Sequence, residues 1–515
     1  MNENAKKPDA RTPIRMQAPL GERQTVTELS EDFTLPDYQP EIKRLLRVRA
    51  NVQPPEIYIG AGNVECSGTV DYTVLYSGND GALYCTDQSG EYRFSFPAEL
   101  PADFDAGEGL LCDLENIPET VTGRVSAPRK LTLRCRLRSR AHLFGTRVLP
   151  DPVEPSPGIQ RLTGTCESAH VFLGMGEPLT LGDEILCDPQ DSDVRVICAD
   201  GQVFVTEAGA GSGTVNCRGE LCLKLLCCHD ATGETYSLLR RIPFSQAVEA
   251  EGVEVNCDCA AQGTAQDLRI TVGDGRIQCE ATVRLRVRAQ RNETVALTRD
   301  AYSTDSECIT AYQDLTVPTA LRCVGGNFSL GTALPLEEVG IRAGLRPADI
   351  DGSVTMGEVE SDRGKYYLNG KCRFHVILAG EDDWSAQEIE VPFRYETDGA
   401  RESLPVSAAE LSANLISCRA RIDGERIGID AEIAVSGAMR GERSARVLSD
   451  CRMGEKWQAP GAVFTVCYPA SGDTLWSVAR RYHRPVSELA AKNALAPSPA
   501  ADAKDSLAGV RYLII

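Results

Sequence analysis

The residues of this chain best suited to chemistry lie near the C-terminus, in the run Gly-Asp-Thr-Leu-Trp-Ser-Val-Ala-Arg-Arg-Tyr at positions 472–482. This run brings together a carboxylate, a hydroxyl, an indole and two guanidinium groups, and Asn493 follows eleven residues later. Such groups can hold a ligand by hydrogen bonds, but the run shows no nucleophile placed beside a base. It therefore predicts binding rather than catalysis.

Hydrophobic periodicity predicts the elements that position these groups. The i, i+3, i+4, i+7 spacing of a helix occurs twice, at Leu475, Val478, Ala479 and Tyr482 and again at Val486, Leu489, Ala490 and Asn493. Asp473 or Thr474 can cap the start of the first helix, and Pro485 suits the entrance of the second. Residues 463–466 before the helices and 510–514 after them are predicted to be strands.

This strand-helix-helix-strand order and the Gly-Asp-Thr-Leu-Trp run resemble a LysM module, at residues 462–515. LysM modules recognise N-acetylglucosamine-containing glycans, so the resemblance implies glycan binding between a first loop at 472–475 and a second at 494–497. The candidate partner- or glycan-binding residues are Gly472, Asp473, Thr474, Leu475, Trp476, Arg480, Arg481, Tyr482, Asn493 and Pro497. Core packing of Leu475 and Trp476, and a solubility role for Arg480 and Arg481, stay open as alternatives.

The chain has 515 residues, room for about three or four domains of ~100–200 residues each, and a net charge of −20. Because phosphate neutralisation needs clustered Lys and Arg, this balance argues against nucleic acid as a partner. Residues 1–24 are a polar tail without the apolar core of a secretory signal. We find no run of ~20 apolar residues, so we expect no transmembrane helix and a cytosolic location.

The twenty cysteines and five histidines show no Cys-x-x-Cys pair and no clustered histidines. Because a structural zinc site needs paired ligands at short spacing, we expect no metal and no cofactor, and cysteines that are small buried hydrophobes. Oxidative cross-linking after release from a reducing cytosol is an alternative raised only by the cysteine count. The chain also lacks the common catalytic motifs, which predicts that it is not an enzyme.

An internal repeat organises the rest of the sequence. Gly68, Gly219 and Gly370 are 151 residues apart, and each opens an alternating strand that is followed by a second strand with a Phe beside Pro. Period-two patterning with frequent turns predicts antiparallel sheets, most simply a sandwich. We therefore predict a mainly β chain, with tandem β-sandwich-like domains at 25–149, 158–299 and 306–453 before a small βααβ module.

The first repeat opens with Leu-Pro-Asp-Tyr-Gln-Pro-Glu-Ile at positions 35–42. This opening, a Gly-led strand that ends in Leu-Tyr, and a later Phe-Pro strand resemble the SPOCS domain of spore-coat morphogenetic proteins in endospore-forming Firmicutes. The resemblance implies a scaffold at the forespore surface, in the mother-cell cytoplasm. Its LysM module would dock a coat basement-layer ATPase, and its β repeats would order further coat proteins. The alternative is a protein that binds peptidoglycan through the LysM module.

Overall fold

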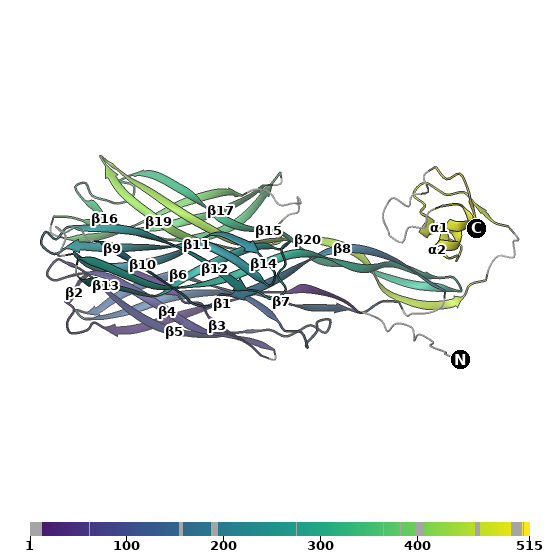
Figure 1. The fold of residues 1–515 in the computed structure, drawn as a ribbon, viewed down its shortest axis with the longest axis horizontal. Helices are drawn as coiled ribbons and strands as arrows, with labels where there is room; N and C mark the ends of the chain where they lie inside the picture. Colours follow the sequence, from purple (N-terminus) through teal and green to yellow (C-terminus); the bar gives the residue numbers. More distant parts are fainter. Residues whose placement is uncertain are drawn as a thin grey trace.

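The computed structural model describes residues 13–60, 62–153, 158–186, 194–273, 275–363, 365–381, 383–397, 406–458, 464–495, 507 and 509–515. Pro497 and the second predicted loop beyond Leu495 lie outside these residues. The described chain forms an elongated β body, from which a narrow stalk extends to a small C-terminal module (Figure 1).

Repeat 1, residues 14–149, contains two antiparallel sheets. One has the strand order β1-β7-β6. In the other, β4 pairs with β5 on one side and with β2 and β3 in succession on the other. The strands of repeat 1 are β1 Ile14–Thr34, β2 Ile42–Val52, β3 Glu56–Ile59, β4 Asn63–Gly78, β5 Leu83–Pro97, β6 Leu111–Ala127 and β7 Lys130–Leu149. Strand β1 begins inside the segment that was predicted to be a polar tail ending at residue 24. That boundary is corrected because β1 pairs with β7 along its length, from Ile14 opposite Leu149.

Repeats 2 and 3 follow the same plan, at residues 159–303 and 306–456. Repeat 2 has the sheet orders β10-β11-β12 and β13-β14-β8, with β9 also on β14, and repeat 3 has β15-β20-β19 and β16-β17-β18. The strands of repeat 2 are β8 Ile159–Met175, β9 Leu179–Leu186, β10 Val194–Ala210, β11 Thr214–His229, β12 Thr235–Glu249, β13 Asp258–Gly273 and β14 Arg276–Ser303. Those of repeat 3 are β15 Ser306–Pro335, β16 Arg346–Asp362, β17 Lys365–Ala379, β18 Trp384–Thr397, β19 Ala408–Asp423 and β20 Arg426–Lys456.

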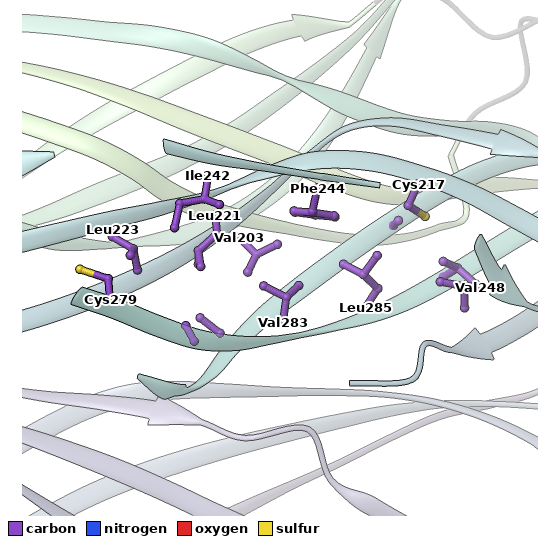
Figure 2. Close-up of a cluster of buried hydrophobic side chains, with 14 of the residues drawn as sticks. Val203, Cys217, Leu221, Leu223, Ile242, Phe244, Val248, Cys279, Val283 and Leu285 are labelled. Atoms are coloured by element: carbon purple, nitrogen blue, oxygen red, sulfur yellow. The ribbon is translucent and has the colours of Figure 1, made fainter. Parts of the chain in front are cut away.

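In each repeat the two sheets share a core built from alternating residues. In repeat 2, Leu221 on β11 and Leu285 on β14 are fully buried and belong to one cluster with Val203 and Phe244 (Figure 2). Repeat 3 has an equivalent cluster around Phe374. The predicted mainly β chain of antiparallel sheets is therefore confirmed, and period-two alternation is the reason that the sequence predicted it.

The repeated glycines allow a close approach between neighbouring strands. Gly219 on β11 lies opposite Phe244 on β12, and a Cβ added there would lie 2.3 Å from the carbonyl oxygen of Phe204 and 2.7 Å from the Phe244 ring. The same opposition recurs for Gly68 with Tyr92 and for Gly370 with Phe393. An aromatic ring therefore covers each glycine, which explains why a glycine and an aromatic residue recur together in the sequence.

Equivalent positions of the three repeats meet at the centre of the body. Arg49, Asp200 and Asp351 are 151 residues apart on the equivalent strands β2, β10 and β16. The Arg49 guanidinium pairs with both carboxylates, at 3.1 Å from Asp351. Contact among equivalent positions places the repeats around a common axis, so the body is organised like a trimer made from one chain.

A buried carboxylate joins all three repeats beside this axis. Asp349 of repeat 3 pairs at 2.6 Å with Arg47 of repeat 1 and also pairs with Lys224 of repeat 2, with 2% of its side chain exposed. Burial alone would raise the pKa of Asp349, but Arg47 and Lys224 outweigh it and hold this pKa below its ordinary value. The repeats are therefore connected by charged contacts as well as by apolar ones.

The stalk consists of the far ends of four strands, residues 159–166, 295–303, 306–315 and 445–456. Strand β8 pairs with β14 there, and β15 pairs with β20. An apolar cluster lies where the stalk joins the body, and it includes Leu297, Leu315 and Val447 together with Met16 of β1. Because β20 continues to Lys456, the predicted boundary of the third domain at residue 453 falls inside a strand.

The C-terminal module begins at Phe464 in the described chain and contains β21 Val466–Cys467, α1 Leu475–Arg481, α2 Val486–Lys492 and β22 Leu513–Ile514. Its strands pair antiparallel. Thr474 caps α1, with its hydroxyl accepting from the Ser477 amide and the Ser477 hydroxyl accepting from the Thr474 amide. The predicted order of strand, helix, helix and strand is thus present, with shorter strands than the sequence predicted.

Candidate functional site

The candidate residues of the first loop, Gly472, Asp473 and Thr474, lie at the N-terminal end of α1, whereas Arg480, Arg481 and Tyr482 lie at its C-terminal end. Gly472 has a φ of +90°, a conformation that favours glycine, and a Cβ added there would meet nothing within 4 Å. Asp473 follows and accepts hydrogen bonds from the Ala470 amide at 2.9 Å and the Arg481 guanidinium at 2.8 Å. The first loop is therefore held by its own contacts and leaves Gly472 open to solvent.

Electrostatics fix Asp473 in its ionised form. The hydrogen bond from the Ala470 amide, followed by the contact with Arg481, holds the pKa of Asp473 below its ordinary value. Arg481 is half-exposed, and its contact with Asp473 raises its own pKa in turn. Asp473 is largely buried, whereas half of the Arg481 side chain is exposed, so the Arg481 guanidinium remains accessible to a ligand.

Other candidate residues build the module. Leu475 is 6% exposed and packs with Val478, Ala479 and Leu489 in the core, which favours the packing alternative for this residue. Tyr482 ends α1 as its C-cap residue, and a hydrogen bond with the Cys467 thiol raises its pKa.

Asn493 connects the second helix to the second strand. Its side-chain amide donates to the carbonyl oxygens of Leu489 at 2.9 Å and Ile514 at 2.8 Å, and its oxygen accepts from the Ile514 amide at 2.7 Å. These three bonds use most of its hydrogen-bonding capacity. The structure therefore gives Asn493 a role within the module and leaves little of it for a ligand.

Trp476 and Arg480 point out of the module toward the stalk. The Trp476 indole donates to Asp300 Oδ2 at 2.8 Å, and Arg480 Nη1 donates to the same carboxylate at 2.7 and 2.9 Å. Burial lowers the pKa of Arg480, but Tyr312 and Asp300 outweigh it and raise that pKa. Both side chains were predicted to contact an external partner or a glycan, and in this structure they contact the same chain.

Sequence reasoning missed an exposed aromatic face on the module. Phe464, Tyr468 and Tyr512 are exposed by 66%, 75% and 53% of their areas, whereas the intervening Cys467 and Leu513 are buried in the core. This alternation places the aromatic side chains on the outer face of the β21–β22 pair. The sequence carried part of this signal, since Tyr512 lies beside Leu513 on the predicted strand at 510–514, whereas Cys467 and Tyr468 lie beyond the predicted strand at 463–466.

A large cavity lies in the body rather than in the module. It measures about 1280 Å³, and its lining includes residues of the edge strands β2, β6, β10, β13, β16 and β19 from all three repeats. Ion pairs neutralise much of its wall, as between Arg138 and Glu119 at 3.0 Å. Among the described residues we find no group of three or more His, Cys, Asp or Glu side chains suited to a metal ion.

The four arginines between positions 134 and 140 on β7 differ in exposure. Arg134 and Arg136 are exposed on β7, but Arg138 and Arg140 are half-buried and line the cavity. The cysteines that the structure describes form no disulfide with one another, and Cys217, Cys227 and Cys372 are buried in repeat cores. Their predicted role as small hydrophobes is confirmed at these positions.

Comparison with known proteins assigns a family to one part of the chain. Residues 470–498 match the LysM domain family. No curated protein and no solved structure matches the chain. The match spans the first loop, α1 and α2 and stops short of the β repeats, so the resemblance of repeat 1 to SPOCS domains stays a prediction. The C-terminal module therefore contains a LysM domain, a type of domain associated with the binding of peptidoglycan and related glycans.

Proposed function

We propose that this chain is a non-enzymatic protein that binds peptidoglycan, or another glycan containing N-acetylglucosamine, through its LysM domain. The observation that carries the proposal is the family match at residues 470–498, which includes the open loop at Gly472. The three-repeat body and the stalk serve as a scaffold that presents this domain at one end of the molecule (Figure 1).

The geometry of the module supports this choice of ligand surface. Gly472 is open, Arg481 is half-exposed, and Ala494 at the start of the second loop has a φ of +53°. Trp476 and Arg480 are engaged by the stalk. The ligand therefore binds the module at its two loops and not on the face of α1 that the stalk covers.

Cosedimentation with purified peptidoglycan and titration with chitotetraose test the proposal. The full chain is expected to bind, and a chain that ends at Gly461 is expected not to bind. Gly472→Ala places a side chain at a positive φ in the ligand loop and should weaken binding. Gly424→Ala is the control, because it also places a side chain at a positive φ, in a body hairpin where a Cβ meets nothing within 4 Å. Equal binding by the truncated chain would refute the proposal.

A second candidate function is a spore-envelope morphogenetic scaffold. The arrangement of three similar repeats around one axis favours it, because a multi-repeat body offers several surfaces for other proteins. In this proposal the protein acts at the forespore surface, on the mother-cell side, with a coat ATPase and other coat proteins as partners. No helix in the described residues is long and apolar enough to cross a membrane.

The location of a fluorescent fusion during the growth cycle separates the two candidates. A ring around the forespore supports the scaffold, and loss of that ring when the chain ends at Gly461 assigns targeting to the LysM domain. Signal on the vegetative wall or septum instead supports peptidoglycan binding alone.

A further inference from the structure

Two register shifts between paired strands of the stalk direct polar side chains toward the module. The register of β14 against β8 shifts between Thr298 and Asp300, and that of β15 against β20 shifts between Ala311 and Tyr312. Such bulges insert an extra residue and redirect the side chains beside them. Here they bring the Tyr312 hydroxyl to within 2.7 Å of Asp300 Oδ1, to which it donates.

Asp300 is the centre of the contact between the stalk and the module. Its carboxylate accepts from the Trp476 indole, the Arg480 guanidinium and the Tyr312 hydroxyl, and 14% of its side chain is exposed. Arg480 also reaches the Thr310 hydroxyl at 3.3 Å. Because charge-assisted bonds of this kind are directional, they fix the orientation of α1 as well as its position.

The stalk also supplies part of the module's interior. Tyr302 is 1% exposed and belongs to the same apolar cluster as Leu475, Val478 and Leu513. Its ring meets the Trp476 ring edge-on, with centroids 4.8 Å apart, and its hydroxyl donates to the Arg484 carbonyl oxygen at 2.7 Å. Removal of the stalk would therefore open the module's core to water.

A strained residue of the module is held from the stalk side. His483, which follows α1, has a φ of +52°, an uncommon conformation for a residue with a Cβ. Its Nδ1 lies 2.7 Å from the Ser303 carbonyl oxygen, and its ring stacks on Trp457 at 4.1 Å. Strain of this kind persists where the surrounding contacts impose it, and here those contacts come from outside the residues that match the LysM family.

We propose that the stalk tip is an integral part of the ligand-binding unit, with Asp300 and Tyr302 as positioning residues for the LysM domain. The unit that binds glycan is then the stalk tip together with the module, held in one orientation relative to the body. We call the contacts of Asp300 and Tyr302 with the module the joint. The role of the joint in ligand binding rests on the proposed glycan binding, whereas the joint itself does not.

Hydrogen exchange of the α1 amides in the full chain tests the joint without a ligand. Asp300→Ala leaves Arg480 and Trp476 without their acceptor, and we expect exchange at Val478 and Tyr482 to rise about tenfold or more. Asp300→Asn keeps the size and one acceptor oxygen, so it should show a smaller rise and remain folded. Asp314→Asn is the matched control, because that carboxylate is exposed on the same stalk strand pair.

Chitotetraose binding by the same variants tests the functional step. We expect Asp300→Ala to weaken binding about tenfold or more and Asp314→Asn to leave it unchanged. Unchanged α1 exchange in Asp300→Ala overturns the joint, and faster exchange with unchanged affinity overturns its role in binding. If the wild-type chain binds no chitotetraose or peptidoglycan, the proposed function fails, while the exchange comparison still decides the joint.

Discussion

At the scale of single residues, the body is shaped by glycines that allow an aromatic ring to lie against a neighbouring strand. Gly219 is restricted on two sides, since an added Cβ would meet both the Phe204 carbonyl and the Phe244 ring. The Phe204 oxygen belongs to the backbone of β10 and has little freedom to move. A methyl group at this position therefore requires the sheet itself to shift.

We predict that Gly219→Ala lowers the free energy of unfolding of repeat 2 by about 1–3 kcal/mol, the range for overpacking a close contact. Urea denaturation, followed by far-ultraviolet circular dichroism of the strands, measures the change in the free energy of unfolding. Gly209→Ala on β10 is the control, because its Cβ would meet nothing within 4 Å. An equal loss in both variants would show that strand propensity, and not the close approach, is responsible.

At the scale of elements, the module depends on side-chain caps because its helices and strands are very short. Helices α1 and α2 have seven residues each, and the two strands have two residues each. Helices of this length are unstable alone. Asn493 compensates by joining the end of α2 to β22 through three hydrogen bonds, which makes it a structural link.

We predict that Asn493→Ala destabilises the module by about 1–3 kcal/mol, since it leaves backbone groups of Ile514 and Leu489 without their partner. Thermal unfolding and glycan affinity measured on the same samples separate structure from ligand contact. Affinity should recover at lower temperature, where the module is folded. Ser487→Ala, at an exposed position of α2, should change neither quantity, and a temperature-independent loss of affinity would instead make Asn493 a ligand residue.

At the scale of the whole molecule, buried charges connect repeats that are distant in sequence. Asp349 contacts Arg47 and Lys224, and Arg49 contacts Asp351 on the equivalent strand. Replacing one partner leaves the others buried without a counter-charge, which costs more than the intact network contributes. These contacts favour one arrangement of the three repeats, because equivalent positions do not all carry the same charge: Arg49 is matched by Asp200 and Asp351.

We predict that Asp349→Asn lowers stability at pH 7 by about 3–5 kcal/mol. The pKa of Asp349 is lowered in the folded chain, so this carboxylate stabilises fully above its unfolded pKa of about 3.9 and loses that effect as pH falls through the folded pKa. Urea midpoints at pH 7 and pH 3 should therefore differ less in the variant than in the wild type. Asp423→Asn, at an exposed hairpin, should keep the wild-type difference.

The sequence by itself determined the local structure, because the relevant signals are periodic and short-range. Alternation predicted the strands, the 151-residue spacing of Gly68, Gly219 and Gly370 predicted the repeats, and helical spacing with Thr474 predicted α1. The same short-range signals identified the LysM segment, and they also located most of the loop that we propose as the ligand site.

Only the tertiary structure decided what the polar side chains contact. Arg49, Asp200 and Asp351 meet because three separate sheets converge, and no local pattern encodes that convergence. From the sequence, Trp476 and Arg480 could contact either an external partner or their own chain. In the structure, the bulge before Asp300 places its carboxylate against both side chains. Hydrogen bonds between residues more than 170 positions apart depend on the path of the whole chain, and the spacing within either segment does not contain that information.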